Sequence, residues 1–338
     1  LLDFESTPAG PARLSMSNID PAAHLLSHCG ALQSGESFLL VVDASTQALA
    51  ERFLTAARVL GAHAETAVIP VADRHGAEPP PFLAPMMQQA DLVAGLTFKS
   101  LAHTRTRLAF TEAGGRYLSL PGYSESLLRD PAITADFHAQ FERTRRITEA
   151  FTAGSWVRVA TAAGTDIQLD IDGRVGNCCP GFVSGDYRLG SPPDIESNVS
   201  PVEDASEGIV VVDGSVACEE IGLLRAPITL HVAGGRIRRF ESEIPEYVET
   251  CERLFARVAS PLAYVLAECG VGLNPAATLT GNMLTDEGVL GCVHFGFGSN
   301  ATVGGLNDVP FHIDFVFRQA SLWIDGEPIL LDGEPVIG

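Results

Sequence analysis

Residues 37–71 read SFLLVVDASTQALAERFLTAARVLGAHAETAVIPV and combine two strand-like segments with one helix-like segment. A β-rich run (37–45) ends in turn residues, and apolar residues then recur at helical spacing (46–62), with Gly61 at the C-cap position. Further β-rich runs follow at 63–71, 91–98 and 116–122, with helical segments between the later ones. Strands that alternate with helices predict a parallel α/β sheet with right-handed crossovers.

The sequence changes character from Trp156 onward. Short β-rich runs are interrupted by Gly, Asp and Asn, and one helix is expected around 247–259. Period-2 alternation with D-G and G-G pairs indicates hairpins. We therefore predict an N-terminal parallel-sheet α/β domain over residues 1–150, followed by a strand-rich α+β domain over residues 151–338.

The composition excludes several classes of partner. The 338 residues carry a net charge of −20, and Lys99 is the sole lysine. Such a polyanion is not expected to bind nucleic acid or anionic membranes, and no apolar run reaches the roughly 18 residues that a spanning helix needs. The seven cysteines are scattered without a C-x-x-C pair, which favours reduced thiols and a cytoplasmic location. Because the chain begins at Leu1, a missing N-terminal segment stays open.

Common cofactor motifs are missing from the sequence. It contains no phosphate-binding G-x-x-x-x-G-K-[ST], no G-x-G-x-x-G after the first β-rich run and no H-E-x-x-H. The PGYSES segment (121–126) does not match a nucleophile elbow.

Polar residues stand out on otherwise apolar strands in the second half. In VPFHIDFVF (309–317), alternation places His312 and Asp314 on one face of a strand. His294 lies in GCVHFGFG (291–298), and Glu268 is the single charge in LAYVLAECGVGLNP (262–275). Glu203 precedes another predicted strand, in NVSPVEDASEG (198–208). Buried carboxylates of this kind need a partner.

A divalent metal would be such a partner. These residues include three carboxylates, two imidazoles and no lysine. If they converge, repulsion between the carboxylates would raise their pKa values unless a cation is present. Mixed histidine and carboxylate ligands suit Zn, Mn, Co or Fe(II), as one or two ions. A hydrogen-bonded core histidine at His294 and a turn carboxylate at Glu203 are the alternatives for those positions.

Several ordered segments resemble the C-terminal domain of the M29 metal-dependent aminopeptidases: AECGVGLNP, TDEGVLGCVHFGFGSNATVGG, FHIDFVF and LWIDGEPIL. NVSPVEDASEGIVVVDGSV is similar to the segment of that family that carries a metal-binding glutamate. The resemblance implies a small-molecule or short-peptide substrate, a metal-activated water that cleaves an amide, and a homo-oligomer. The ligands it implies are Glu203, Glu268, His294, His312 and Asp314, with Glu268 and His294 also in catalytic roles.

A second branch of the same superfamily provides the alternative. The chain also resembles 2,5-dihydroxypyridine 5,6-dioxygenase, a mononuclear iron enzyme, in its layout and in the short linker before His312. That branch has a histidine where Glu268 stands, so the sequence favours the hydrolase and keeps a non-haem Fe(II) ring-cleaving dioxygenase as the alternative. A member that binds a ligand without turnover is the third possibility.

The first half offers candidate substrate contacts. His103 and Arg105, in KSLAHTRTR (99–107), are predicted to line the cleft between the domains and to contact a carboxylate or ring of the substrate. The alternative for both residues is the solvated face of a helix.

Overall fold

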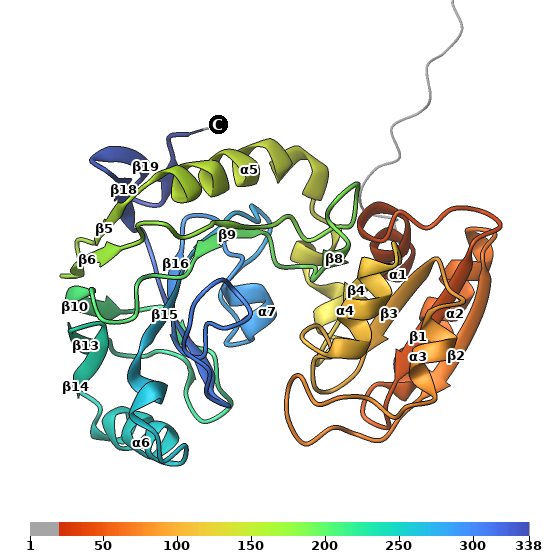
Figure 1. Ribbon diagram of the computed structural model, residues 1–338, viewed down its shortest axis with the longest axis horizontal. Coiled ribbons are helices and arrows are strands. Elements are labelled where there is room, and N and C mark those ends of the chain that lie inside the picture. Colours follow the sequence, from red (N-terminus) through yellow and green to blue (C-terminus); the bar gives the residue numbers. More distant parts are fainter. Residues whose placement is uncertain (1–19, 338) are drawn as a thin grey trace, which may run out of the picture.

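The computed structural model describes residues 20–337. Figure 1 shows an α/β unit built from the first part of the chain beside a larger, strand-rich half. The sheet of the α/β unit has five parallel strands in the order β2-β1-β3-β4-β8. These strands are β1 (Ser37–Val42), β2 (His63–Val68), β3 (Leu92–Leu96), β4 (Arg116–Ser119) and β8 (Leu189–Gly190).

Helices cover both faces of this sheet, so its central strands are apolar throughout. In β1, Phe38 and Leu40 face one hydrophobic cluster and Leu39 and Val41 face another. A strand buried on both faces reads as a continuous apolar run, which explains why SFLLVV shows no alternation. The helices of this part are α1 (Pro21–His24), α2 (Ala50–Val59), α3 (Leu83–Met87) and α4 (Arg105–Glu112).

The strand-rich half contains two antiparallel sheets. The eight-stranded sheet has the order β14-β13-β10-β6-β5-β18-β19-β20. Its strands are β5 (Trp156–Ala160), β6 (Asp166–Asp170), β10 (Glu207–Val212), β13 (Ile228–Ala233), β14 (Arg236–Ser242), β18 (Ser321–Ile324), β19 (Glu327–Leu331) and β20 (Glu334–Pro335). The helix expected around 247–259 is α6 (Pro245–Ala256), and the short α7 (Met283–Asp286) adds a turn that the sequence pattern did not predict.

The second sheet, of seven strands, has the order β12-β11-β17-β16-β15-β9-β7. Its strands are β7 (Asn177–Cys179), β9 (Glu196–Val199), β11 (Ser215–Val216), β12 (Gly222–Leu223), β15 (Leu266–Gly272), β16 (Val293–Gly298) and β17 (His312–Phe317). Residues paired across antiparallel strands share a face. One face carries buried phenylalanines such as Phe295 and Phe315, which are paired to each other. The opposite face carries the polar residues, since Gly296 pairs with Asp314 and Gly298 with His312.

The two halves are joined by more than one crossing of the chain. The long helix α5 (Phe137–Ala153) runs along the strand-rich half and packs against β9 and β7 (Figure 1). Residues 189–190, from the second half of the sequence, supply the fifth strand of the N-terminal sheet through pairing with β4. The predicted fold class is confirmed, while a domain boundary at residue 150 stays a prediction. Over residues 20–337, no helix has the length and apolar character needed to cross a membrane.

Candidate metal centre

The polar face of the seven-stranded sheet brings one carboxylate-rich group together on β15 and β17. Nε2 of His312 lies 3.2 Å from Oδ1 of Asp314 and 3.5 Å from Oε2 of Glu268. On the other side of the ring, Nδ1 of His312 lies 2.8 Å from the carbonyl oxygen of Ser299, to which it can donate. That bond would leave Nε2 as the ring nitrogen available to a metal, with Glu268 and Asp314 within reach of the same ion.

A second group shares Glu268 and lies deeper. Nε2 of His294 is 3.1 Å from Oε2 of Glu196 and 3.9 Å from Oε1 of Glu268. Ligand atoms of these three residues fall within 4.8 Å of one another. The His294 side chain is 1% exposed, whereas that of His312 is 31% exposed. The site is therefore open on the side of His312 and closed on the side of His294.

Glycines provide the space for both imidazoles. A Cβ atom at Gly270 would lie 2.1 Å from Nε2 of His294, and one at Gly296 would lie 2.8 Å from Oδ1 of Asp314. Any side chain at either position would displace the group it faces, because real Cβ contacts are never this short. These glycines on adjacent strands form a cradle for the polar residues.

Several buried polar atoms around the two groups lack hydrogen-bond partners among the described residues. They are Oδ1 of Asp194, Oε1 of Glu287 and Nδ1 of His294, while Oε2 of Glu196 has only its 3.1 Å contact with Nε2 of His294. A buried polar atom without a partner costs about 1–3 kcal/mol, and more if it is charged. Because most of these atoms are carboxylate oxygens, the missing partner has the chemistry of a cation.

The electrostatics of the centre reflect the excess of carboxylates. Burial raises the pKa of Glu268, and the charge of Glu196 raises it further, despite the nearby imidazoles. Burial also raises the pKa values of Asp194 and Glu287 well above the usual range, assisted by neighbouring carboxylates. Repulsion and burial thus both disfavour the charged carboxylates, and a bound divalent ion would stabilise those charges.

The imidazoles compensate for part of this negative charge. Burial disfavours the charged form of His312, but Asp314 and Glu268, with the carbonyl of Ser299, together outweigh burial and raise the pKa of His312 to about 10. The pKa of His294 is raised well above its ordinary value in the same way, because Glu196, Glu268 and Asp314 together outweigh burial. A metal that binds these nitrogens must displace their protons, so its affinity is expected to rise with pH.

Amide side chains orient the deeper group. Nδ2 of Asn198 donates to Oε1 of Glu196 over 2.7 Å, which turns Oε2 toward His294. Asn177 in turn donates to Oδ1 of Asn198 over 2.9 Å. Cys179, paired with Glu196 across β7 and β9, has the pKa of its thiol raised by burial and by the charge of Glu196.

Glu203 is the one predicted ligand that the structure does not place with the others. It lies in a turn after β9, where its Oε2 forms a 2.5 Å ion pair with Nη2 of Arg174. Its Oε1 accepts from Nδ2 of Asn300 (3.0 Å) and from the backbone N–H of Leu306 (2.7 Å). With both oxygens occupied, Glu203 lies outside both groups of candidate ligands, and Glu196 stands in the deeper group instead.

Glu196 was missed although the sequence contained a signal for it. In DIESNV (194–199), Asp194, Glu196 and Asn198 alternate with Ile195 and other small or apolar residues. That is the same period-2 pattern that identified His312 and Asp314. The resemblance to the segment around Glu203 directed attention seven residues too far along the chain. Glu287, just after α7, has no such strand pattern and could not be found in this way.

The two predicted substrate contacts of the first half differ in position. His103 follows β3 and lies near enough to His312 for the charge of one ring to lower the pKa of the other, in addition to the larger effect of burial and the charge of Arg107. Arg105 begins α4, and its side chain is 92% exposed with Nε 3.6 Å from Oε1 of Glu78. His103 thus interacts electrostatically with the group of Glu268, His312 and Asp314, which we call the metal group, while Arg105 lies in solvent.

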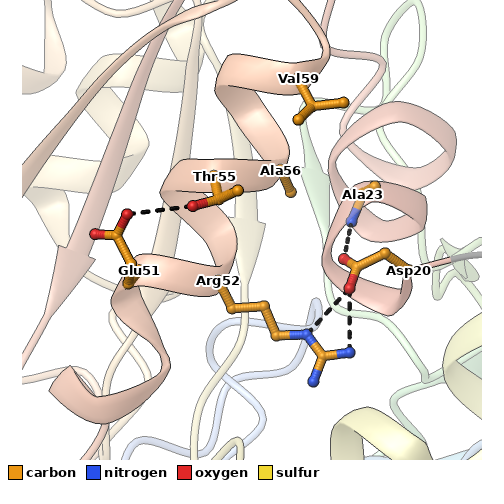
Figure 2. A pocket seen from close by; sticks show the side chains of 7 residues that line it. All are labelled: Asp20, Ala23, Glu51, Arg52, Thr55, Ala56 and Val59. Carbon is orange, nitrogen blue, oxygen red and sulfur yellow. Dashed lines mark hydrogen bonds and ion pairs between the residues drawn. The ribbon is translucent and has the colours of Figure 1, made fainter.

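A separate groove of about 360 Å³ lies between α1 and α2. Figure 2 shows its lining, in which Arg52 contacts the carboxylate of Asp20 and Glu51 accepts from Thr55. The polar groups of this groove are paired with one another. We therefore assign no ligand to it.

Comparison with known proteins identifies the family of this chain. The model of the family "2,5-dihydroxypyridine 5,6-dioxygenase" matches residues 19–337. The 2,5-dihydroxypyridine 5,6-dioxygenase of Pseudomonas putida KT2440 is 29% identical over 147 residues, which cover 40% of this chain and 41% of that protein. The matched part therefore spans about two fifths of the curated relative.

Two solved structures share the fold. The 2,5-dihydroxypyridine dioxygenase of Pseudomonas putida KT2440 superposes with a TM-score of 0.76 at 19% identity, covering 96% of this chain and 98% of the other. Wild-type AmpT from Thermus thermophilus superposes with a TM-score of 0.66 at 15% identity, covering 94% and 98%. The family match overturns the prediction of an M29-type hydrolase and favours the alternative given with it. The chain belongs to the 2,5-dihydroxypyridine 5,6-dioxygenase family.

Proposed function

We propose that this protein is a non-haem Fe(II)-dependent dioxygenase that opens the ring of a hydroxylated nitrogen heteroaromatic. The observation that carries the proposal is the convergent group of Glu268, His312 and Asp314, found in a chain whose family model is that of a ring-cleaving dioxygenase. Non-haem Fe(II) oxygenases typically hold the ion with two histidines and one carboxylate and leave positions open. The group here has the same donor types in another ratio, one histidine with two carboxylates.

The residues present fit an iron ion. The donor atoms converge, the glycine cradle leaves them room, and carboxylate oxygens nearby lack partners. We place the iron between His312, Asp314 and Glu268, because this is the group that opens outward. When bound there, Fe(II) would supply the means to bind a substrate hydroxyl and dioxygen side by side.

Glu196 and His294 complete the centre on its closed side. Their side chains lie 3.1 Å apart. The raised pKa of His294 favours its positively charged form, which offsets the charge of the carboxylates around the proposed ion. In the proposed arrangement, His294 offsets the negative charge of Glu268, and Glu196 fixes the position of the His294 ring. One ion per chain is therefore proposed, with the deeper group as its support.

His103 is the proposed contact to the substrate from the first half. Burial and the charges of Arg107 and His312 lower its pKa, which keeps the imidazole neutral at pH 7. A neutral imidazole can accept the proton of a ring hydroxyl. In this arrangement the substrate lies between His103 and the metal group, with its hydroxyl side toward His312.

The test begins with protein purified under argon and loaded with Fe(II). We expect about one iron per chain and oxygen uptake that depends on 2,5-dihydroxypyridine or a related hydroxypyridine. Asp314→Asn should remove both, because it takes a charged ligand from the proposed ion. The matched control is Glu203→Gln, which alters an acidic residue of the same half outside the metal group and should keep both. Iron-loaded wild type that consumes no oxygen with any hydroxypyridine would contradict the proposal.

A further inference from the structure

A second candidate binding site lies at the C-terminal ends of the strands of the N-terminal sheet. In the order β2-β1-β3-β4-β8, the chain leaves β1 in one direction and β3 in the other. Open parallel sheets bind ligands at such a switch point, outside the carboxyl ends of the strands. Here the segment 97–104, after β3, occupies this position.

Hydrogen bonds from neighbouring segments fix this loop. The backbone N–H of Phe98 donates to Oδ2 of Asp43 (2.7 Å), at the end of β1. The N–H of Ser100 donates to Nδ1 of His75 (3.3 Å), and the N–H of Gly76 donates to the carbonyl of Ser100 (2.9 Å). His75 thus carries its own proton on Nε2, as a free donor. The loop is a platform prepared before any ligand binds.

The platform is basic in a strongly acidic protein. We call His75, Lys99, His103 and Arg107 the basic patch; Lys99 and Arg107 carry its positive charge, because burial lowers the pKa of both histidines. No carboxylate among residues 20–337 lies within 4.0 Å of the charged nitrogens of Lys99 or Arg107, whereas Arg116, for example, pairs with Glu36 at 2.5 Å. The Lys99 amine instead lies 4.6 Å from the centre of the Phe98 ring. The chain has 42 acidic residues, yet none of those in the described part of the chain forms an ion pair with the sole lysine.

The basic patch is on the metal side of the α/β unit. His103 feels the charge of His312, and His75 feels the charge of Lys99, each in addition to the larger effect of burial. The loop that joins β2 to α3, which carries His75, reaches toward the strand-rich half in Figure 1. His103 is therefore the member of the patch that links it to the metal group, through its electrostatic interaction with His312.

We infer that the basic patch receives an anionic substituent, of the carboxylate class, on the ring of the substrate. This inference rests on the proposed function and specifies its substrate as a hydroxylated heteroaromatic acid. The net charge of −20 and the carboxylates of the metal centre repel an anion, so the anion needs a local cation to bind at all. Lys99 and the Nε2–H of His75 supply a charge-assisted pair of donors for it.

The test uses two ring probes that differ only in charge, pyridine-4-carboxylate and the neutral pyridine-4-carboxamide. Their dissociation constants are measured by calorimetry on protein loaded with Zn(II), which is redox-inactive. Wild type should bind the carboxylate about tenfold more tightly than the amide, the size expected for one charge-assisted hydrogen bond. Lys99→Met should abolish this preference, and Lys99→Arg should keep most of it. Arg58→Met, on the outer surface of α2, is the control and should leave it intact.

Three outcomes would overturn the inference: equal binding of the probes by wild type, no measurable binding of the carboxylate, or a preference that survives Lys99→Met. These outcomes are separate from a failure of the proposed function. Binding to the Zn(II) form involves no oxygen chemistry, so a protein that discriminates the probes but consumes no oxygen would refute the dioxygenase and retain the anion site.

Discussion

A Cβ atom at Gly296 would lie 2.5 Å from Nε2 of His312, so the imidazole occupies space that every other residue type would fill. Gly296→Ala should therefore push His312 and Asp314 out of alignment. We expect metal affinity to fall by about tenfold or more, the range seen when the support of a metal ligand is altered. Metal titration with a competing chelator measures the change.

Gly173→Asn is the control for that variant. Gly173 lies in an exposed turn with a φ of +72° and no atom within 4 Å of a Cβ, and asparagine tolerates this conformation. Its metal affinity should match wild type. An unchanged affinity in Gly296→Ala would show that the cradle is not needed.

Asn198 should act on the metal through Glu196. Asn198→Ala removes the 2.7 Å hydrogen bond that fixes the Glu196 carboxylate, and we expect metal affinity to fall about tenfold while the fold persists. Asn198→Asp keeps the shape but places another anion against Glu196, so it should be worse than alanine in the metal-free protein. Metal titration together with thermal unfolding of the metal-free form separates these effects. Equal metal affinity in all three proteins would remove Asn198 from the centre.

Glu203 and Glu268 should respond in opposite ways to the same substitution. Glu203→Gln weakens the pair with the buried Arg174, so the free energy of unfolding should drop by about 1–3 kcal/mol with metal content unchanged. Glu268→Gln removes one of several crowded anions, so the metal-free protein should be stabilised while metal content falls. Chemical denaturation of the metal-free forms and metal analysis of the loaded forms provide the readouts. A loss of metal in Glu203→Gln would restore it as a ligand.

Acid should weaken the junction between α1 and α5 through a histidine cluster. The rings of His24 and His28 stack at 4.6 Å, and His138 meets His28 edge-on at 4.4 Å, with an oxygen of Asp136 3.7 Å from Nε2 of His28. Burial, with the charges of His24 and His138, lowers the pKa of His28 to about 4. Since the unfolded chain then binds more protons, stability should decrease as the pH falls from about 6.5 to about 4.

Denaturation of wild type and of His28→Gln at pH 7 and pH 5 measures that contribution. The variant should lose less stability than wild type between the two pH values, because its side chain does not titrate. An identical decrease in both proteins would assign the acid sensitivity to other groups.

The sequence predicts those parts of this protein that local pattern determines. The alternation around His312 and Asp314 placed both side chains on one face, as found, and the single charge of Glu268 in an apolar run marked a buried polar site. The parallel sheet followed from strands that alternate with helices. Each of these inferences uses contacts within one segment or the general rules that join neighbouring segments.

What the sequence could not supply depends on contacts between distant segments. Glu203 binds Arg174, which precedes it in the chain, and the 300–306 loop, which follows about 100 residues later. No local sequence pattern could therefore predict its structural role. The reaction class was also beyond the residues alone, because the ligands resemble those of a hydrolase while the chain as a whole matches a dioxygenase family. Glu287 reaches the centre from the turn after α7, where its carboxyl group interacts with that of Asp314 on a separate strand.

The strand β8 gives the protein a particular order of assembly during synthesis. The N-terminal sheet lacks its fifth strand until residues 189–190 have left the ribosome, well after α5 has been made. Until then the edge of β4 is unpaired and open to pairing with another chain. The α/β unit is therefore finished by a piece of the other half, so a nascent chain stopped near residue 150 would present an unfinished sheet.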